Sequence, residues 1–580
     1  MDRRAFLRKP ASALTAPVAA ALDRPAAGGN EPPGSGETIS KFANKSLPTA
    51  PRSLAGLAPY TGTWGHAQAA HLLRRATFGS TRAEINTAAS QSLTQVLDRL
   101  FTAPATPEPP VMGFPGDPLL PLGSPFVTGN NEGGWNGRCS VRAWWLGQML
   151  KDTTIVEKMT LFWQNHFVVL LDTDAGILDS RFGYRYSALI RRMALGNIKQ
   201  LAKDVTIEPG MLKFLNGHNN SVDAPNENYG RELLELFSIG KGPLISGGNY
   251  TTYTERDVQA AARVLTGWQY SQENLNSYFT ASRHETGPKQ FSSAFGNRVI
   301  TNQGDQEYKT LIDMIFDRPE TAAFLVRKLY RWFVYYVIDA ATEQNVIQPL
   351  AAQLRNNGYN VAPVLRTLLA SEHFFDAVNI GNMIKSPFDF VIGTIRQLPV
   401  AFPPESDIEL LYAYRYTLVE IAERMQQYIC NPPNVAGWPA YWQTPQYYQM
   451  WINAMTLRWR NEFTTAVSGE YGYNIVVNGV IHRLKIDIIA WVQSLPAAVA
   501  ADCNQLIAEM VKLLLAIPLT PNQMAFLNDT LLPGLPDFEW TVEWQAFLAA
   551  PNDATKRNAV ESKLRAVVNQ IMGLAEYHLS

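Results

Sequence analysis

The spacing of apolar residues limits the fold of this chain more than any other feature of its sequence. Apolar side chains recur every three or four residues in most of its long segments, including Arg82 to Phe101, Val141 to Phe167 and Ile408 to Tyr428, which is the period of an amphipathic helix. The alternation typical of half-buried strands is scarce, and no repeat of fixed length indicates a solenoid. We therefore expect a mainly α-helical protein, built as one large multi-helix globular body.

One segment departs from the helical pattern. Tyr473 to Leu484 contains two β-branched runs on either side of Asn478-Gly479. Asn-Gly readily adopts the left-handed backbone of a two-residue hairpin turn. The sequence therefore predicts a small β-hairpin at residues 473–484.

The amino-terminal residues predict an export signal rather than part of the fold. Arg3-Arg4 and the apolar residues that follow resemble a twin-arginine signal over residues 1–22, with a basic disordered tail as the alternative. Residues 23–50 are rich in Pro, Gly and Ser and predict a flexible linker. We expect the helical domain to span residues 51–580, and the protein to be exported to the periplasm, the cell surface or the extracellular medium.

Charge and cysteine content exclude several classes of protein. The chain has 50 Lys and Arg against 51 Asp and Glu, a net charge of −1, so no global field attracts nucleic acid. Three cysteines without a CxxC pair indicate neither a disulfide framework nor a thiolate zinc site. No window of about 18 uninterrupted apolar residues predicts a membrane span.

The segment from Glu157 to Phe167 is typical of a buried helix that ends in polar residues. From Met159 onward apolar residues cover nearly every side of the helical wheel, yet Gln164, Asn165 and His166 close the segment. Buried polar groups need hydrogen-bond partners, so the three residues are either satisfied parts of the core or members of a site.

The segment from Asn226 to Gly240 predicts an amphipathic helix. Its charged arc consists of Glu227, Asn228, Arg231, Glu232 and Glu235. One interpretation is a solvated face with a Glu227–Arg231 ion pair. The other is a row of carboxylates facing a cleft, where like charges raise one pKa into the range useful for acid–base catalysis.

Two loops also concentrate polar or aromatic side chains. The stretch from Ser282 to Lys289 bears His284, basic residues and a carboxylate, and is either a functional loop or a solvated one. From Trp438 to Trp451 there are six aromatic residues, several prolines and no charge. That segment is either a wall of core aromatics or a platform on which sugar rings stack.

These segments, in this order, resemble the DUF1800 family of bacterial proteins, which implies that residues 51–580 form a DUF1800 helical domain. Gln164 stands where the family usually has a histidine, which would weaken a site that used both histidines as metal ligands. The resemblance rests on seven strings: His71 to Gly79, Lys158 to Phe167, Pro225 to Phe237, Asp257 to Trp268, Phe324 to Tyr330, Ile384 to Phe390 and Pro432 to Pro439.

The expected function is hydrolysis of an extracellular polymer or ester in a cleft shared by these motifs. Glu232 or Glu235 would act as general base or metal ligand, and His166 and His284 as acid, base or ligand. The remaining candidates are Asn165 and Asn226 as orienting donors, Glu227 in the carboxylate row, and Arg231 and Lys289 stabilising negative charge.

The alternative expectation is a non-catalytic binding or scaffolding protein at the cell surface. Its Trp438 to Trp451 segment would contact glycan or a partner chain. Family resemblance suggests a DUF1501-type protein as that partner. The cofactor is unknown from the sequence; a divalent metal is compatible with the histidines and carboxylates, but their spacing names none.

Overall fold

A computed structural model describes residues 52–129, 131–172 and 177–580. The predicted export signal at residues 1–22 and the predicted linker at residues 23–50 lie outside the described residues. Residues 52–580 form one compact unit.

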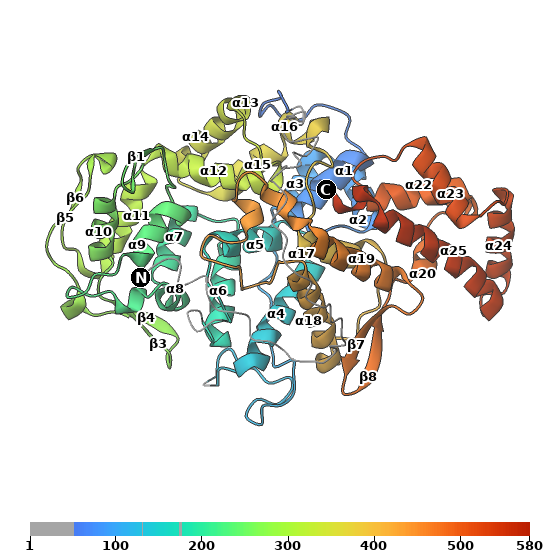
Figure 1. Ribbon diagram of the computed structural model, residues 1–580, viewed down its shortest axis with the longest axis horizontal. Helices are drawn as coiled ribbons and strands as arrows, with labels where there is room; N and C mark the ends of the chain where they lie inside the picture. The colour runs from blue at the N-terminus through green and yellow to red at the C-terminus, as the bar shows by residue number, and fades with distance from the viewer. Residues whose placement is uncertain (1–51, 130, 173–176) are drawn as a thin grey trace, which may run out of the picture. The chain divides into compact units, whose positions relative to one another are not determined.

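The prediction of a mainly α-helical fold is confirmed: helices pack around one extended hydrophobic core (Figure 1). The first half of the described chain contains α1 (His66–Ala76), α2 (Arg82–Ser90), α3 (Leu93–Leu100), α4 (Gly134–Lys151), α5 (Val156–His166), α6 (Ser180–Arg192), α7 (Ile198–Thr206), α8 (Pro209–Phe214), α9 (Glu227–Glu232), α10 (Glu255–Val264), α11 (Glu307–Phe316) and α12 (Pro319–Phe333). The second half contains α13 (Ala340–Thr342), α14 (Gln348–Asn356), α15 (Val361–Leu369), α16 (Glu372–Phe375), α17 (Pro387–Gln397), α18 (Ile408–Arg424), α19 (Ala454–Ser468), α20 (Ile488–Gln493), α21 (Ala497–Ala501), α22 (Cys503–Leu514), α23 (Pro521–Leu531), α24 (Phe538–Ala549) and α25 (Ala554–Gly573).

Some helices are shorter than the apolar spacing predicts, because polar caps interrupt the pattern. The segment expected to run from Arg82 to Phe101 is two helices, α2 and α3. Ser92 starts the second helix with a capping box, in which its hydroxyl accepts the Gln95 amide at 3.2 Å and the Gln95 side chain accepts the Ser92 amide at 2.9 Å.

The predicted hairpin is also confirmed. Strands β7 (Tyr473–Val477) and β8 (Val480–Leu484) pair antiparallel, and Asn478 and Gly479 have φ angles of 50° and 78°. Three further antiparallel pairs, which the sequence did not predict, are β1 (Leu244–Ser246) with β2 (Asn249–Tyr250), β3 (Trp268–Ser271) with β4 (Asn276–Phe279), and β5 (Lys289–Gln290) with β6 (Val299–Ile300).

The helix predicted in the segment from Asn226 to Gly240 changes its winding. It is α-helical from Glu227 to Glu232 and continues as a π-helical turn, η2 (Leu233–Phe237). A π-helical turn leaves carbonyl oxygens without their usual intrahelical donors. Across the described ranges, no helix has both the length and the apolar character needed to cross a bilayer.

Candidate anion-binding cavity

A small buried cavity, called here the basic cavity, lies where segments distant in sequence meet. The cavity has a volume of about 20 Å³, which is enough for one small group. Three of the seven strings noted in the sequence contribute to it, together with the aromatic segment. Its lining consists of Arg74, Arg75, Lys158, Trp332, Met383, Ile384, Ser386, Asp389, Tyr441, Tyr448, Trp451 and Ser580.

Helix α1 carries two buried arginines in its last turn, where the helix dipole favours positive charge. Arg74 Nη2 donates to the carbonyl oxygens of Lys512 and Leu513, and Arg75 Nη2 donates to Asn382 Oδ1 at 2.7 Å. Burial lowers the pKa of each guanidinium to about 10. Both groups therefore remain charged at neutral pH, without a carboxylate bound to either one in the described chain.

Lys158, by contrast, has a counterion in the same cavity. It lies in the first turn of α5, where the dipole disfavours a cation, and it forms an ion pair with Asp389. Ser386 caps α17 and donates to Asp389 Oδ2 at 2.8 Å, with Pro387 as the first helical residue. The sequence Ser-Pro-Phe-Asp thus fixes the carboxylate that balances Lys158.

Several buried donors in this cavity have no hydrogen-bond partner within the described ranges. They are Arg74 Nε, Arg75 Nε, Arg75 Nη1 and Trp332 Nε1. Buried donors are almost always paired in native proteins, and leaving one unpaired costs about 1 to 3 kcal/mol. Since the lining carries three cationic side chains against the Asp389 carboxylate and the terminal carboxylate of Ser580, it supplies what an anion requires: an excess of positive charge and free N–H groups.

Further basic groups lie around Phe390, in the segment that supplies Asp389. The Arg460 guanidinium lies 4.7 Å from the Phe390 ring centroid, and two of its nitrogens have no partner among the described residues. His578 stacks on the same ring, and burial together with Arg460 and Lys385 lowers its pKa to about 3. Arg460 therefore adds to the positive potential of this region, whereas His578 is neutral at pH 7.

The polar residues at the end of α5 point to different partners. Asn165 Oδ1 accepts the Trp438 amide at 2.8 Å, which ties the aromatic segment to the core. His166 is buried, with Nε2 donating to the Phe237 carbonyl at 3.0 Å and Nδ1 accepting from Lys328 Nζ at 2.9 Å. Lys328 also donates to a carbonyl of the π-helical turn, Leu236 O, at 3.1 Å.

The charged face of α9 is laced by ion pairs. Asn226 caps the helix by accepting the Asn228 amide at 2.9 Å. Arg231 Nη2 lies 2.9 Å from Glu227 and 2.6 Å from Glu255 of α10. The Glu227–Arg231 pair predicted from the sequence is therefore present.

The remaining carboxylates of this segment lie on either side of the change in winding. Glu235, in the π-helical turn, forms an ion pair with Lys241 and accepts from Tyr253 Oη at 3.3 Å. Glu232, the last residue of α9, is half-buried.

His284 and Lys289 meet on a buried acid, Glu307 of α11, and we call these three residues the Glu307 cluster. His284 Nε2 lies 3.1 Å from Glu307 Oε2, and Lys289 Nζ lies 2.6 Å from Glu307 Oε1. The side chains of Lys289 and Glu307 are 0% exposed. His284 Nδ1 also lies 2.9 Å from the Thr266 carbonyl, so each ring nitrogen has a partner.

The structure thus brings His284 and Lys289 together but gives His166 other partners. No hydrogen bond or ion pair of the described chain joins His166 to His284. Catalytic roles for the nine candidate residues stay a prediction. In the described ranges, no group of three His, Cys, Asp or Glu side chains is arranged to hold a metal ion.

The aromatic segment is mostly internal. Trp438 and Trp451 are 1% and 3% exposed, which agrees with a wall of core aromatics, while Trp442 is 39% exposed. Beside the basic cavity lies an outer groove of about 400 Å³ to which Trp438, Met450 and Trp451 contribute. Trp451 lines both spaces.

Arg75, Lys158 and Asp389 are not among the site residues predicted from the sequence. A usable signal was present, because Arg74-Arg75 and Lys158 each occur within helices that are buried on nearly every side. A cation in such a helix requires either a counterion or a ligand.

The fold and the cavity define a class of protein: a mainly helical chain whose distant motifs enclose buried, partly unbalanced positive charge. The family model described as a protein of unknown function (DUF1800) matches residues 71–577, so the chain belongs to the DUF1800 family. Neither the curated proteins nor the solved structures contain a match to this chain.

Proposed function

We propose that this DUF1800 protein binds a ligand through a small anionic group, a carboxylate, phosphate or sulfate, which enters the basic cavity. The observation that carries the proposal is the set of unpartnered, buried N–H groups of Arg74, Arg75 and Trp332. An oxyanion would accept from them and neutralise the two arginines that have no carboxylate partner.

Water is the competing occupant of this cavity. A water molecule accepts hydrogen bonds and would satisfy one or two donors, but it carries no charge to set against the buried guanidinium groups, of which Arg75 is attracted by Asp389 and neither has a carboxylate bound to it. The lining has three cationic side chains against Asp389 and the terminal carboxylate of Ser580, and this remaining positive charge favours an anion.

The outer groove supports a ligand larger than a free ion. Its volume of about 400 Å³ is in the range of about 300 to 1,000 Å³ usual for ligand sites. Trp451 is the residue that both spaces share, so a ligand that reaches both would have to pass beside or displace this side chain. An acidic polymer outside the cell, such as a glycan bearing carboxylates or sulfates, fits this geometry and the export predicted from the sequence.

Binding is better supported than hydrolysis by the contacts of the candidate residues. His166, His284 and Lys289 are buried and held by internal partners, and Glu227 and Glu235 form ion pairs. Hydrolysis of a polymer or ester and association with a DUF1501-type protein remain predictions from the sequence.

Thermal unfolding in different anions tests the proposal. Sulfate, phosphate and acetate are compared at one ionic strength, held constant with a bulky sulfonate salt that is too large for the cavity. An anion present at 100 times its dissociation constant would stabilise the native state by about 2.7 kcal/mol. Arg75→Gln should remove this anion-specific stabilisation.

The matched control is Arg458→Gln, which removes an arginine whose side chain is 78% exposed on α19. Sulfate and phosphate also stabilise proteins by exclusion from their surface, so both variants should keep that general effect. Equal stabilisation of the wild type and Arg75→Gln by every anion would contradict the proposal.

A further inference from the structure

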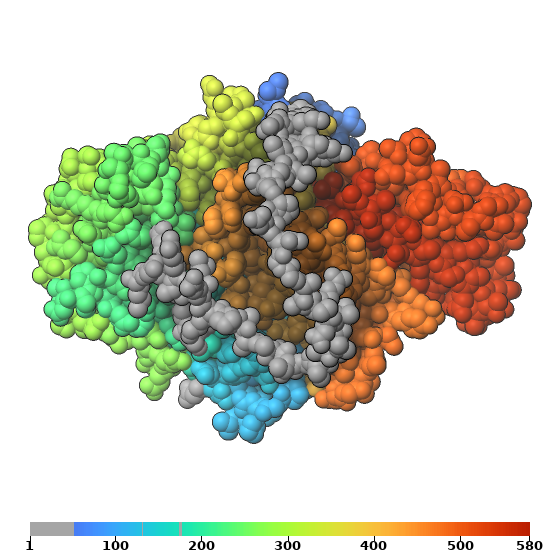
Figure 2. Space-filling model, in the orientation of Figure 1, coloured from blue at the N-terminus to red at the C-terminus, as the bar shows by residue number. Residues whose placement is uncertain are grey.

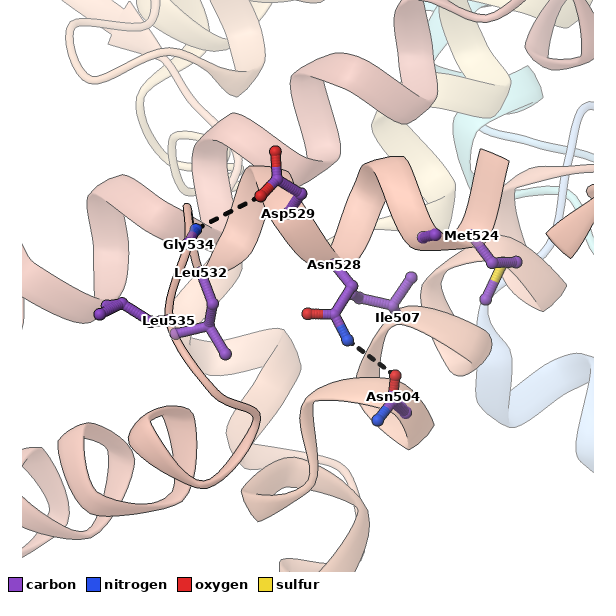
Figure 3. Close-up of a pocket in the computed structure, with 9 residues that line it drawn as sticks. Asn504, Ile507, Met524, Asn528, Asp529, Leu532, Gly534 and Leu535 are labelled. Carbon is purple, nitrogen blue, oxygen red and sulfur yellow. Dashed lines mark hydrogen bonds between the residues drawn. The ribbon is translucent and has the colours of Figure 1, made fainter. Parts of the chain in front are cut away.

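The carboxyl-terminal helices carry a second, larger groove that is unrelated to the basic cavity. Helices α22, α23, α24 and α25, drawn in orange-red and red, pack together in Figure 1, and their surface is visible to one side in Figure 2. The groove measures about 470 Å³. Figure 3 shows its lining, which comprises Asn504, Ile507, Met524, Ala525, Asn528, Asp529, Leu532, Gly534 and Leu535.

The walls of this groove combine apolar residues with Asn504, Asn528 and Asp529, and part of them is open to solvent. Ile507, Met524 and Leu532 form its apolar lining, and Leu535 at its edge is 47% exposed. Figure 3 shows Leu532 and Leu535 on the segment that follows α23, across the groove from Ile507.

Beyond that edge, the next helix continues the apolar surface. Phe538 and Val542, one turn apart on α24, are 60% and 57% exposed, whereas Trp540 and Trp544 of the same helix are buried. Phe538 follows the groove residue Leu535 by three positions in the sequence, and exposed apolar residues of this size are typical of a protein interaction site.

The charged side chains at the groove itself are acidic. Asp529 is the one charged residue of the lining, and Asp537, which precedes α24, is held by Asn504 of the lining. Basic residues of the surrounding helices have acidic partners: Lys512 of α22 lies 3.2 Å from Glu509, and Lys563 of α25 lies 2.6 Å from Glu543. Asp529 and Asp537 are exposed and form no ion pair with any described residue.

Asparagine side chains hold part of this acidic rim in place. Asn504 Nδ2 donates to Asp537 Oδ2 at 2.7 Å, and Asn528 Nδ2 donates to Asn504 Oδ1 at 2.8 Å. Asp529 accepts the Gly534 amide at 3.3 Å, which orders the turn that follows α23 (Figure 3). The rim is thus arranged before any partner binds, which lowers the entropic cost of association.

We infer that this carboxyl-terminal groove docks a basic amphipathic helix of a partner protein. An apolar stripe at three- and four-residue spacing would enter between α22 and α23 and extend along Leu535 and Phe538. Lysines and arginines flanking the stripe would lie opposite Asp529 and Asp537. A second copy of this chain is a poorer occupant, because two acidic rims would repel each other.

Binding of a designed peptide tests the inference. The probe is a 14-residue helical peptide of leucine and lysine, with leucines on one face, and its counterpart replaces every lysine by glutamate. Isothermal titration should show one lysine peptide bound per chain, with weaker binding as salt increases, and no binding of the glutamate peptide.

Two groove variants and two matched controls locate the binding. Leu535→Ser and Asp529→Lys should each weaken lysine-peptide binding at least fivefold. Leu244→Ser, at a leucine that is 65% exposed on β1, and Asp223→Lys, at an exposed acid before α9, should leave it unchanged. Circular dichroism confirms that each variant is folded.

Three outcomes would overturn the inference. The first is equal binding of the lysine peptide by the groove variants and the controls, and the second is binding of the glutamate peptide. The third is self-association in analytical ultracentrifugation that Leu535→Ser abolishes and the lysine peptide does not compete with, since the groove would then serve a second copy.

Discussion

The Glu307 cluster and the basic cavity differ in how their buried positive charge is balanced. In the Glu307 cluster, one carboxylate lies between Lys289 and His284, and both ring nitrogens of the histidine have partners. In the basic cavity, Arg74 and Arg75 donate only to uncharged oxygens, and part of each guanidinium has no acceptor in the described chain.

This difference separates a structural role from a binding role more clearly than residue type does. Histidine, lysine and glutamate together resemble a catalytic site in the sequence, but the ion pair between Lys289 and Glu307 already balances the buried charge, even though Glu307 Oε1 has no hydrogen bond within the described chain. The sequence does not predict a site at the arginines of α1, yet both have hydrogen-bond donors without an acceptor in the described chain and neither has a bound carboxylate. A ligand gains most where the protein has left such groups unsatisfied.

The largest expected effect comes from breaking the balanced cluster. Glu307→Gln would leave Lys289 buried without its counterion, and we expect the free energy of unfolding to fall by about 3 to 5 kcal/mol. Denaturant unfolding measures this change. Glu405→Gln, at a carboxylate 65% exposed beside Lys151 and Arg415, should cost less than about 1 kcal/mol. Similar losses for both variants would remove the distinction.

A second prediction concerns Lys328, whose partners are neutral. Burial, with a contribution from Arg331, lowers its pKa from 10.5 to about 7. Between these values the unfolded chain binds more protons than the native state, so the stability of the native state should increase with pH. From pH 7 to 9 the gain for this lysine is at most about 2.7 kcal/mol.

Urea unfolding of the wild type and Lys328→Met at pH 7 and pH 9 measures this gain. The variant should show a smaller increase with pH than the wild type. Burial also lowers the pKa of Lys385 to about 7. Because both proteins contain Lys385, part of the increase in stability with pH should be present in both. A steeper increase in Lys328→Met would show that the pKa of Lys328 is not lowered in the native state.

A smaller effect is expected for Arg75→Gln without a binding anion. The variant loses the bonds to Asn379 O and Asn382 Oδ1 but also removes a buried charge to which no carboxylate is bound, although Asp389 attracts it at longer range. We expect a loss of about 1 kcal/mol or less. Arg191→Gln provides the comparison, because it strips buried Glu157 of its arginine partner and should cost about 3 to 5 kcal/mol. Equal losses of stability in the two variants would mean that other groups of the protein already compensate the charge of Arg75.

The smallest effect belongs to the charged face of α9. Glu227→Gln should reduce stability by about 0.3 to 0.5 kcal/mol, the usual contribution of an i,i+4 ion pair. Arg231 keeps its second partner, Glu255. The anion-specific stabilisation should also be unchanged, as measured by thermal unfolding. Loss of the anion-specific stabilisation in Glu227→Gln would show that the carboxylates of α9 contribute to ligand binding.

Local features of the fold could be predicted from the sequence, whereas long-range ones could not. Helical spacing and the Asn478-Gly479 turn act over a few residues, so most helices and the β7–β8 hairpin follow from them. The β3–β4 hairpin is local too, but its four-residue loop at 272–275 lacks the Asn-Gly pair that marks β7–β8. No local signal marks the π-helical turn at Leu233–Phe237.

The candidate site shows the same limit. The sequence predicts a functional role for His284 and Lys289 from their residue types. Their acidic partner, Glu307, lies on α11, and only the fold shows that it pairs with both side chains. Likewise, Arg75 and Asp389 come from distant strings, and nothing in either string indicates that both line one cavity. Sequence patterns identify chemically capable side chains, and tertiary contacts decide which of them remain unsatisfied.

Anomalous diffraction from crystals grown in selenate, a heavier analogue of sulfate, tests the central claim most directly. We predict an anomalous selenium peak in the basic cavity, with oxygens within hydrogen-bond distance of Arg75 Nε and Nη1 and Trp332 Nε1, and no such peak in Arg75→Gln crystals. A cavity that holds only water at saturating selenate, while selenium occupies exposed surface sites, would contradict the account.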